Sequence, residues 1–323
     1  MKEVSFIHQN SAKWKKFEES FSSMKNDPDF LIENYSQLID DLSFSSTFYP
    51  GSTTTKYLNS LLVKCNSGFH DYRAFGFRKI KSFWTRRQPA VIFKHRRLIF
   101  LAAVITAAGI LIGAVSAAND DTFLRLILGE RYLKMTVENI QNNDPMKVYR
   151  SMSQMDMFLA ITANNIRVAF TAFVFGIFLS FGTGYILLQN GVMLGAFHFL
   201  FYRHDLLLES FLTVWMHGSL EIPAIIVSGA AGLVIGNSFL FPGTFSRLDS
   251  LKSGAREGID LIIGIIPVFL IAAFLEGFVT SQVHVHVWRK VLIITVNFLL
   301  IIWLYILKPG IYTRRKKNEI SQN

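Results

Sequence analysis

The chain has 323 residues, of which 51% are hydrophobic and 14% aromatic, and its formal net charge is +10. Its uncharged apolar runs are long enough to cross a bilayer, which excludes a disordered chain and an ordinary soluble globular protein. The basic residues gather beside these runs. This placement is typical of membrane topology signals and argues against nucleic acid as a partner.

Residues 1–72 predict a cytoplasmic helical domain. Apolar residues recur there at helical spacing in three stripes. An Asp27–Pro28 pair predicts the start of the second helix, because proline is favoured at the first helical position. The stripes comprise Trp14, Phe17, Phe21 and Met24, then Leu31, Tyr35, Leu38 and Leu42, then Leu58, Leu61, Leu62 and Cys65. They predict a small helical core or a surface for a partner.

Residues 73–97 hold nine Lys or Arg and no Asp or Glu, mixed with aromatic residues. This composition predicts a basic aromatic helix lying on the membrane, with anionic lipid headgroups bound near Arg73 to Arg97. The positive-inside rule then places the N-terminus in the cytoplasm. A basic tail at 308–323 predicts the same side for the C-terminus, so the number of crossings should be even.

A transmembrane domain is expected over residues 98–307. Its first span, residues 98–118, has no charge over 21 positions, and about 20 apolar residues cross the hydrocarbon as a helix. An external helical segment should follow over 119–157, broken by "NNDP". Further apolar runs occur at roughly 164–188, 206–236, 258–280 and 291–307.

Two segments depart from regular spans. Residues 190–203 are too short to cross alone if the preceding span reaches Gln189, so they either form a short crossing or re-enter. The run at 206–236 is too long, and helix breaks are expected at Pro223 and, in the next span, at Pro267. Counting the short segment gives about six transmembrane helices. The fold class is therefore an all-α, polytopic helical membrane protein.

Three glycine pairs match the small-residue pattern of close helix packing. They lie in "GILIG" (109–113), "GVMLG" (191–195) and "GLVIG" (232–236). The pattern indicates only that close contacts between helices are possible.

Several polar residues fall inside the apolar runs, where such groups usually face a bundle interior or a wet cavity. They are Asn164, Asn165, Arg167, His217, Glu221 and Glu276. His217 and Glu221 are four residues apart and share one helix face. Three interpretations remain open.

In the first interpretation the group is structural, and Arg167 pairs with Glu221 or Glu276. In the second, His217, Glu221 and Glu276 coordinate a metal ion or bind a cation or headgroup. In the third, the carboxylates line a proton or ion pathway, as in transporters with discontinuous helices. The chain has no H-E-x-x-H, G-x-S-x-G or phosphate-binding glycine loop. We therefore expect no enzymatic activity, and no cofactor beyond a possible metal ion.

Five stretches, in this order, together resemble one known family. They are "SFIHQNSAKWKKFE", "NNIR", "NGVMLGAF", "HGSLEIPAIIVSGAAG" and "LEGFVTS". The chain resembles the stage II sporulation protein M family of integral membrane proteins. By match to these motifs, Asn165, Arg167, His217, Glu221 and Glu276 are the family positions, to which the family assigns no chemical role.

The resemblance implies a polytopic scaffold that recruits peptidoglycan-degrading partners during engulfment in spore-forming organisms. We accordingly expect a non-enzymatic scaffold in the cell membrane, associating with itself and with envelope proteins. The alternative is a transporter or channel component that moves protons, ions or a small solute past the intramembrane His and Glu residues.

Overall fold

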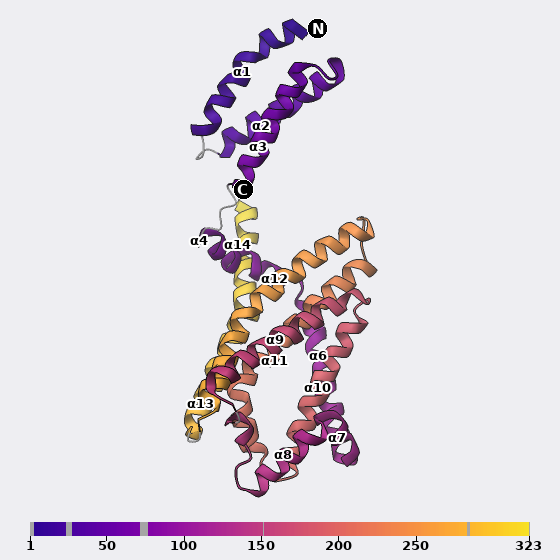
Figure 1. The fold of residues 1–323 in the computed structure, drawn as a ribbon, viewed down its shortest axis with the longest axis vertical. Helices are drawn as coiled ribbons and strands as arrows, with labels where there is room; N and C mark the ends of the chain where they lie inside the picture. Colours follow the sequence, from indigo (N-terminus) through magenta and orange to yellow (C-terminus); the bar gives the residue numbers. More distant parts are fainter. Residues whose placement is uncertain (1–2, 24–27, 72–76, 151, 283–284, 323) are drawn as a thin grey trace. The chain divides into compact units, whose positions relative to one another are not determined.

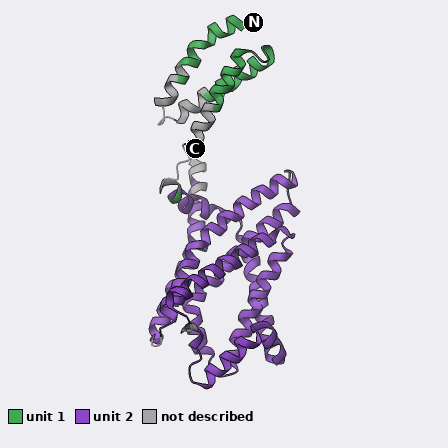
Figure 2. Cartoon of the chain, viewed as in Figure 1, with its two compact units in different colours: residues 1–80 green, residues 81–323 purple. Residues whose placement is uncertain are grey.

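The computed structural model describes residues 3–23, 28–71, 77–150, 152–282 and 285–322. Met24, Asp27 and Arg73 lie outside the described residues, as do the side chains of Phe17, Phe21, Leu31 and Cys65. The chain divides into two compact units, residues 1–80 and 81–323, coloured separately in Figure 2.

Unit 1 consists of three helices, α1 (Glu3–Ser23), α2 (Pro28–Phe48) and α3 (Thr53–Asp71). The predicted apolar stripes supply its core, because Trp14, Leu38 and Leu58 are each at most 3% exposed. The indole Nε1 of Trp14 donates a hydrogen bond of 2.8 Å to the Asp41 carboxylate. The buried aromatic ring thus keeps a partner for its polar atom.

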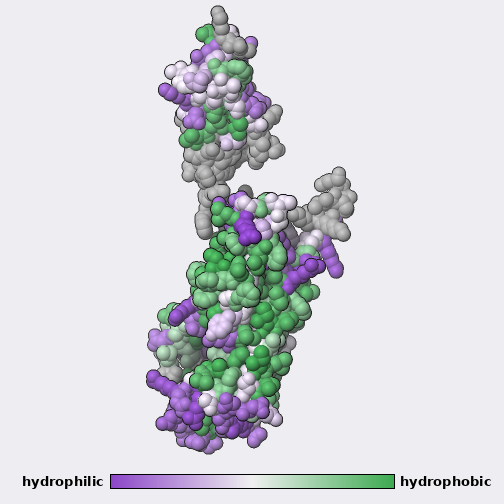
Figure 3. All heavy atoms as spheres, turned by 90° about the vertical axis from the view of Figure 1, so that its right-hand side faces the viewer, coloured by the Kyte–Doolittle hydropathy of each residue, from purple (hydrophilic) through white to green (hydrophobic). Residues whose placement is uncertain are grey.

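Unit 2 is also helical, and among its described residues six helices are long and apolar enough to cross a membrane. These candidate spans are Arg96–Asn119, Gln154–Ile177, Phe181–Tyr202, Leu207–Leu240, Arg247–Thr280 and Val287–Arg315. They correspond to α6, α9, α10, α11, α12 and α13, labelled in Figure 1. Figure 3 shows hydrophobic side chains gathered along this unit, with hydrophilic side chains at its ends. The predicted all-α polytopic fold is confirmed.

The central helix of unit 2 is α11 (Leu207–Leu240), which packs against α6, α9, α10, α12 and α13. Within the most apolar 18-residue stretch of its span 72% of the residues are buried, against 6% in the corresponding stretch of the α13 span. Polar groups on α11 are therefore enclosed by protein, whereas most of α13 faces outward.

The turn between the second and third spans is not where the sequence predicted it. α9 (Gln154–Val174) continues as a short 3₁₀ turn to Ile177, and α10 (Phe181–Tyr202) begins after three intervening residues. Leu179 and Ser180 take left-handed backbone angles, with φ of 53° and 69°. Residues 190–202 are thus the second half of a helix long enough to cross, and Arg203 lies in the turn after it, so 190–203 is not a separate short or re-entrant segment.

The expected helix breaks at Pro223 and Pro267 are also absent. Both prolines lie inside continuous helices, α11 and α12 (Arg247–Phe274). Proline removes one backbone hydrogen bond from a helix, and in membranes neighbouring groups can compensate. The Asn297 amide of α13 (Val287–Ile302) bonds the Met216 carbonyl at 2.8 Å and Ser219 Oγ at 3.0 Å, one to two turns before Pro223. This bridge holds α11 and α13 together next to the weakened turn.

The glycine patterns form real close contacts. "GILIG" on α6 (Arg96–Asn119) faces "GVMLG" on α10. A Cβ at Gly109 would lie 2.6 Å from the Leu188 carbonyl oxygen and 3.1 Å from the Cα of Gly191. Gly232 of "GLVIG" similarly leaves room for Ala172 and Thr183. These helices approach so closely because they present no side chain at the crossing.

Part of the predicted surface helix belongs to the packed unit. After α4 (Phe77–Ser82), of which only the last two residues fall in unit 2, it consists of a π-helical turn (Phe83–Arg87) and α5 (Gln88–Lys94). Helix α5 packs on α12 and on α14 (Lys308–Gln322). Val91 and Ile92 of α5 join the main hydrophobic core. Arg87 Nε bonds the buried Asp260 carboxylate at 2.6 Å. Binding of lipid headgroups by the other basic residues stays a prediction.

The segment 119–157 folds as α7 (Asp121–Leu128), α8 (Glu130–Gln141) and a short 3₁₀ turn (Lys147–Arg150). Gly129, with φ of 84°, separates the two helices where one had been expected. The predicted break at "NNDP" is confirmed, because α8 ends at Gln141. Arg203, at the turn after α10, forms an ion pair with Asp121 and holds the pKa of that carboxyl below its usual range.

Candidate intramembrane site

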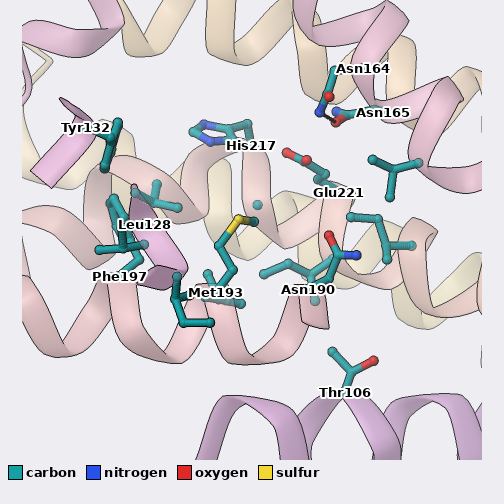
Figure 4. Close-up of a pocket in the computed structure, with 17 residues that line it drawn as sticks. Thr106, Leu128, Tyr132, Asn164, Asn165, Asn190, Met193, Phe197, His217 and Glu221 are labelled. Carbon is teal, nitrogen blue, oxygen red and sulfur yellow. Dashed lines mark hydrogen bonds between the residues drawn. The ribbon is translucent and has the colours of Figure 1, made fainter. Parts of the chain in front are cut away.

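Unit 2 contains a partly open cavity of about 350 Å³ among α6, α7, α8, α9, α10 and α11. Figure 4 shows His217 and Glu221 from α11 on one side of it, with Asn164 and Asn165 from α9 beside Glu221. Thr106, Tyr132 and Asn190 add polar atoms to a wall that is otherwise apolar. The cavity therefore brings most of the predicted polar residues together.

His217 is 4% exposed, and both of its ring nitrogens face polar groups. Nδ1 lies 3.3 Å from the hydroxyl of Thr280, and Nε2 lies 3.7 Å from a carboxylate oxygen of Glu276. Thr280 and Glu276 belong to the π-helical turn Leu275–Thr280 that ends the α12 span. The first distance is a hydrogen bond and the second is too long for one.

Glu221 follows His217 by one helical turn and approaches the same point. One ligand atom from each of His217, Glu221 and Glu276 can be chosen so that all three lie within 4.8 Å of one another. Among the residues the structure describes, neither carboxylate has a Lys or Arg partner. Two carboxyl groups thus share a protein-enclosed site, where charge is costly unless it is neutralised.

Asn165 is 2% exposed, and its side-chain oxygen lies 3.5 Å from the amide of Asn164. Its Nδ2 has no hydrogen-bond acceptor of good geometry in the described part of the chain, although the side chain is close enough to Glu221 to interact with the carboxyl. A buried N–H group without an acceptor costs about 1–3 kcal/mol. The cavity therefore contains a donor that a bound group or water could satisfy.

Arg167 does not take part in this site, so the predicted pairing with Glu221 or Glu276 is wrong. Its side chain is exposed on the outside of α9, although Asn164 lines the cavity. The two residues are three positions apart, but Arg167 turns away from the interior. Sequence spacing alone could not assign these faces, because α9 is polar on both.

Sequence reasoning missed four polar residues of the site, Thr106, Tyr132, Asn190 and Thr280. Thr280 could have been found, because it lies four residues after Glu276 and so on the same face of a helix. Asn190 was hidden by the misplaced turn, and no pattern in the sequence marks Thr106 or Tyr132 as site residues. Burial raises the pKa of the Tyr132 hydroxyl, which lies near Thr136 and Glu276.

Comparison with known proteins assigns the chain to a family. The family described as stage II sporulation protein M matches residues 102–281, more than half of the chain. The chain belongs to the stage II sporulation protein M family. A second family, a domain of unknown function (DUF8413), matches residues 4–70 and so covers most of unit 1.

One relative is an uncharacterized protein of Methanocaldococcus jannaschii, MJ0706. It is 23% identical over 194 residues, which is 59% of this chain and 84% of the relative. No solved structure matches the chain. The matched family region, residues 102–281, contains His217, Glu221, Glu276 and the two asparagines, so the candidate site lies within the part that defines the family.

Proposed function

We propose that this stage II sporulation protein M family member is a non-enzymatic membrane transport component, in which a small cationic solute passes through the intramembrane cavity. One observation supports this most strongly. Glu221 and Glu276 meet His217 beside a cavity, and neither carboxylate has a Lys or Arg partner among the described residues. Ionisable groups retained inside a membrane domain usually mark a substrate or ion path.

The dimensions of the site agree with a small solute. A volume of about 350 Å³ is at the low end of ligand pockets. The surrounding wall is mostly apolar, with the polar groups concentrated near His217 and Glu221. Such a site favours a compact cation over a large polar molecule, because few polar atoms are present to replace a wide hydration shell.

The proposal includes the orientation of the chain in the cell membrane, with both termini cytoplasmic. The six candidate spans support it, since an even number of crossings returns the chain to the starting side. The basic residues before α6 and in α14 support the cytoplasm as that side, because cytoplasmic segments carry an excess of Lys and Arg. Reporter fusions after Arg203 and after Asn323 should report the outside and the inside, respectively.

Thiol labelling tests the cavity. In a Cys65→Ser background, Asn164→Cys places a thiol at the cavity wall, and Phe170→Cys places one on the same helix where the side chain is 57% exposed outside the cavity. A membrane-impermeant, positively charged thiol reagent should modify Asn164→Cys from each side of the membrane and leave Phe170→Cys unmodified in lipid. Labelling of Asn164→Cys from one side only, or from neither, would contradict a passage through the cavity.

A scaffold that organises envelope proteins is the second candidate, and the exposed Arg167 favours it. Arg167 lies 13 residues into the 24-residue span Gln154–Ile177, and it has no ion pair within the described structure. A lipid-facing arginine there is costly, whereas an acidic group of a second copy or of an envelope protein would offset the cost.

Cross-linking in native membranes distinguishes this candidate. Arg167→Ala should abolish cross-linked homo-oligomers or partner complexes, while Lys252→Ala, at an exposed position in the second turn of α12, should retain them. If Arg167→Ala forms the same cross-linked complexes as the wild type, Arg167 no longer supports the scaffold function.

A further inference from the structure

We infer that His217, Glu221 and Glu276 form a binding site for one divalent cation of the zinc or manganese class. The inference rests on the proposed transport function and names the class of its solute. The three side chains come from α11 and from the π-helical turn that ends the α12 span, so a bound ion would join two helices.

The spacing of the donor atoms fits a shared metal ion better than a direct hydrogen bond between the side chains. His217 Nε2 and Glu276 Oε2 are 3.7 Å apart, beyond hydrogen-bond distance. Two ligands at about 2.1 Å from a tetrahedral zinc ion are about 3.4 Å apart. One donor atom from each of the three residues fits within 4.8 Å, so small side-chain movements would close the site around an ion.

The second nitrogen of His217 supports the same assignment. Nδ1 lies 3.3 Å from Thr280 Oγ1, and donation of the Nδ1 proton to this oxygen leaves the lone pair of Nε2 facing the carboxylates. Histidine ligands of metals almost always have such a partner on the other nitrogen, which fixes the tautomer and the ring orientation. Thr280 would therefore be a positioning residue.

Charge favours a divalent ion over a monovalent one. With a neutral imidazole, the two carboxylates give the site a charge of −2, and no Lys or Arg of the described chain balances it. The imidazole argues against magnesium and calcium, which prefer oxygen ligands, and for a transition-metal ion. The cavity beside Glu221 leaves space for a water ligand, and the unsatisfied Nδ2 of Asn165 faces this region.

Protonation of one carboxyl is the other way to neutralise the site, and it makes a different prediction. A proton-sharing pair would bind no metal at equilibrium and would still pass protons. The following experiment separates the two, because it measures binding directly and does not require flux.

The full-length protein, purified without a polyhistidine tag and freed of metal, would be placed in lipid nanodiscs and titrated with Zn²⁺ and with Co²⁺. We expect one tightly bound Zn²⁺ per chain, and visible Co²⁺ absorption bands typical of four or five ligands. Glu221→Gln and Glu276→Gln should weaken Zn²⁺ binding at least 100-fold. Thr280→Val should weaken it 10–100-fold with the helical content unchanged.

Glu209→Gln is the matched control, because it makes the same change on α11 away from the cavity and should bind Zn²⁺ like the wild type. Absence of stoichiometric Zn²⁺ binding by the folded wild-type protein would overturn the inference, as would equal binding by Glu221→Gln. If the protein binds Zn²⁺ but shows no Zn²⁺ flux in proteoliposomes, the metal site is supported and the proposed transport function is refuted. If it passes protons without binding Zn²⁺, the metal site is refuted and the transport function is supported.

Discussion

Replacing Gly109 with alanine should destabilise unit 2, although alanine favours helices more than glycine does. The added Cβ would lie 2.6 Å from the Leu188 carbonyl oxygen, 3.1 Å from the Cα of Gly191 and 3.2 Å from the amide nitrogen of Val192. All three neighbours are backbone atoms. They cannot rotate away, so α6 and α10 must separate along their crossing.

Helix propensity and overpacking act in opposite directions, and their relative sizes decide whether Gly109→Ala raises or lowers the free energy of unfolding. Alanine gains about 1 kcal/mol of helix propensity over glycine. Overpacking of a close contact costs about 1–3 kcal/mol, and separation also weakens the dispersion contacts along the crossing. We expect a net loss of up to about 2 kcal/mol. For a domain of this size that corresponds to a fall in Tm of up to roughly 8 °C.

Gly184→Ala is the internal control. It lies on α10 in the same unit, and a Cβ there would meet no atom within 4 Å. Its Tm should stay the same or rise slightly, since only the propensity gain remains. Thermal unfolding of both variants in the same detergent, followed by size-exclusion chromatography, measures the difference. A Gly109→Ala protein at least as stable as Gly184→Ala would refute the packing argument.

Three further predictions concern polar groups. Asn297→Leu removes two interhelical hydrogen bonds, so it should cost about 1–3 kcal/mol, whereas the exposed neighbour Thr295→Val should not, as measured by thermal unfolding. Tyr305→Phe should leave stability unchanged or raise it by about 1–3 kcal/mol, because the buried hydroxyl has no partner in the described structure; a loss would show that lipid or water bonds it. Burial lowers the pKa of His95, so the fold favours the neutral imidazole. The stability that comes from this preference is fully present above about pH 6.5 and is lost as the pH falls toward the pKa of His95 in the folded state. Unfolding measured between pH 7.5 and 5.5 should therefore depend less on pH in His95→Gln than in the wild type.

Hydropathy was sufficient to predict the class of the protein and the number of spans, because the cost of exposing polar backbone to hydrocarbon leaves few alternatives to long apolar helices. The glycine pairs were also visible. Their partners were not, since nothing in "GILIG" shows that it meets "GVMLG" rather than another helix. Pairing of helices is decided by tertiary packing.

The turn at residues 178–180 has no local sequence signal. It has no proline or Asn-Gly pair, and Leu179 and Ser180 adopt positive φ without the glycine that usually permits it. Instead, the backbone N–H of Ser180 bonds the Gly176 carbonyl at 3.1 Å, and its hydroxyl lies 3.4 Å from the Leu233 carbonyl on α11. The turn is held by contacts with a helix distant in sequence, which a local pattern does not contain.

The metal-like geometry depends on the two residues Glu276 and Gly277. Glu276 lies in a π-helical turn, whose wider hydrogen-bonding pattern redirects its side chains relative to a regular α-helix, and such turns are frequent at functional sites. At Gly277, a Cβ would lie 3.0 Å from the Gln154 carbonyl oxygen, so glycine allows the start of α9 to approach. The same turn therefore directs a carboxylate toward His217 and brings α9, which bears Asn165, close to α12. If stability alone had shaped this region, a regular helix with an apolar residue at 276 would avoid a largely buried carboxylate that has no Lys or Arg partner among the described residues. Retaining both the irregular turn and the charge is most simply explained by a bound cation.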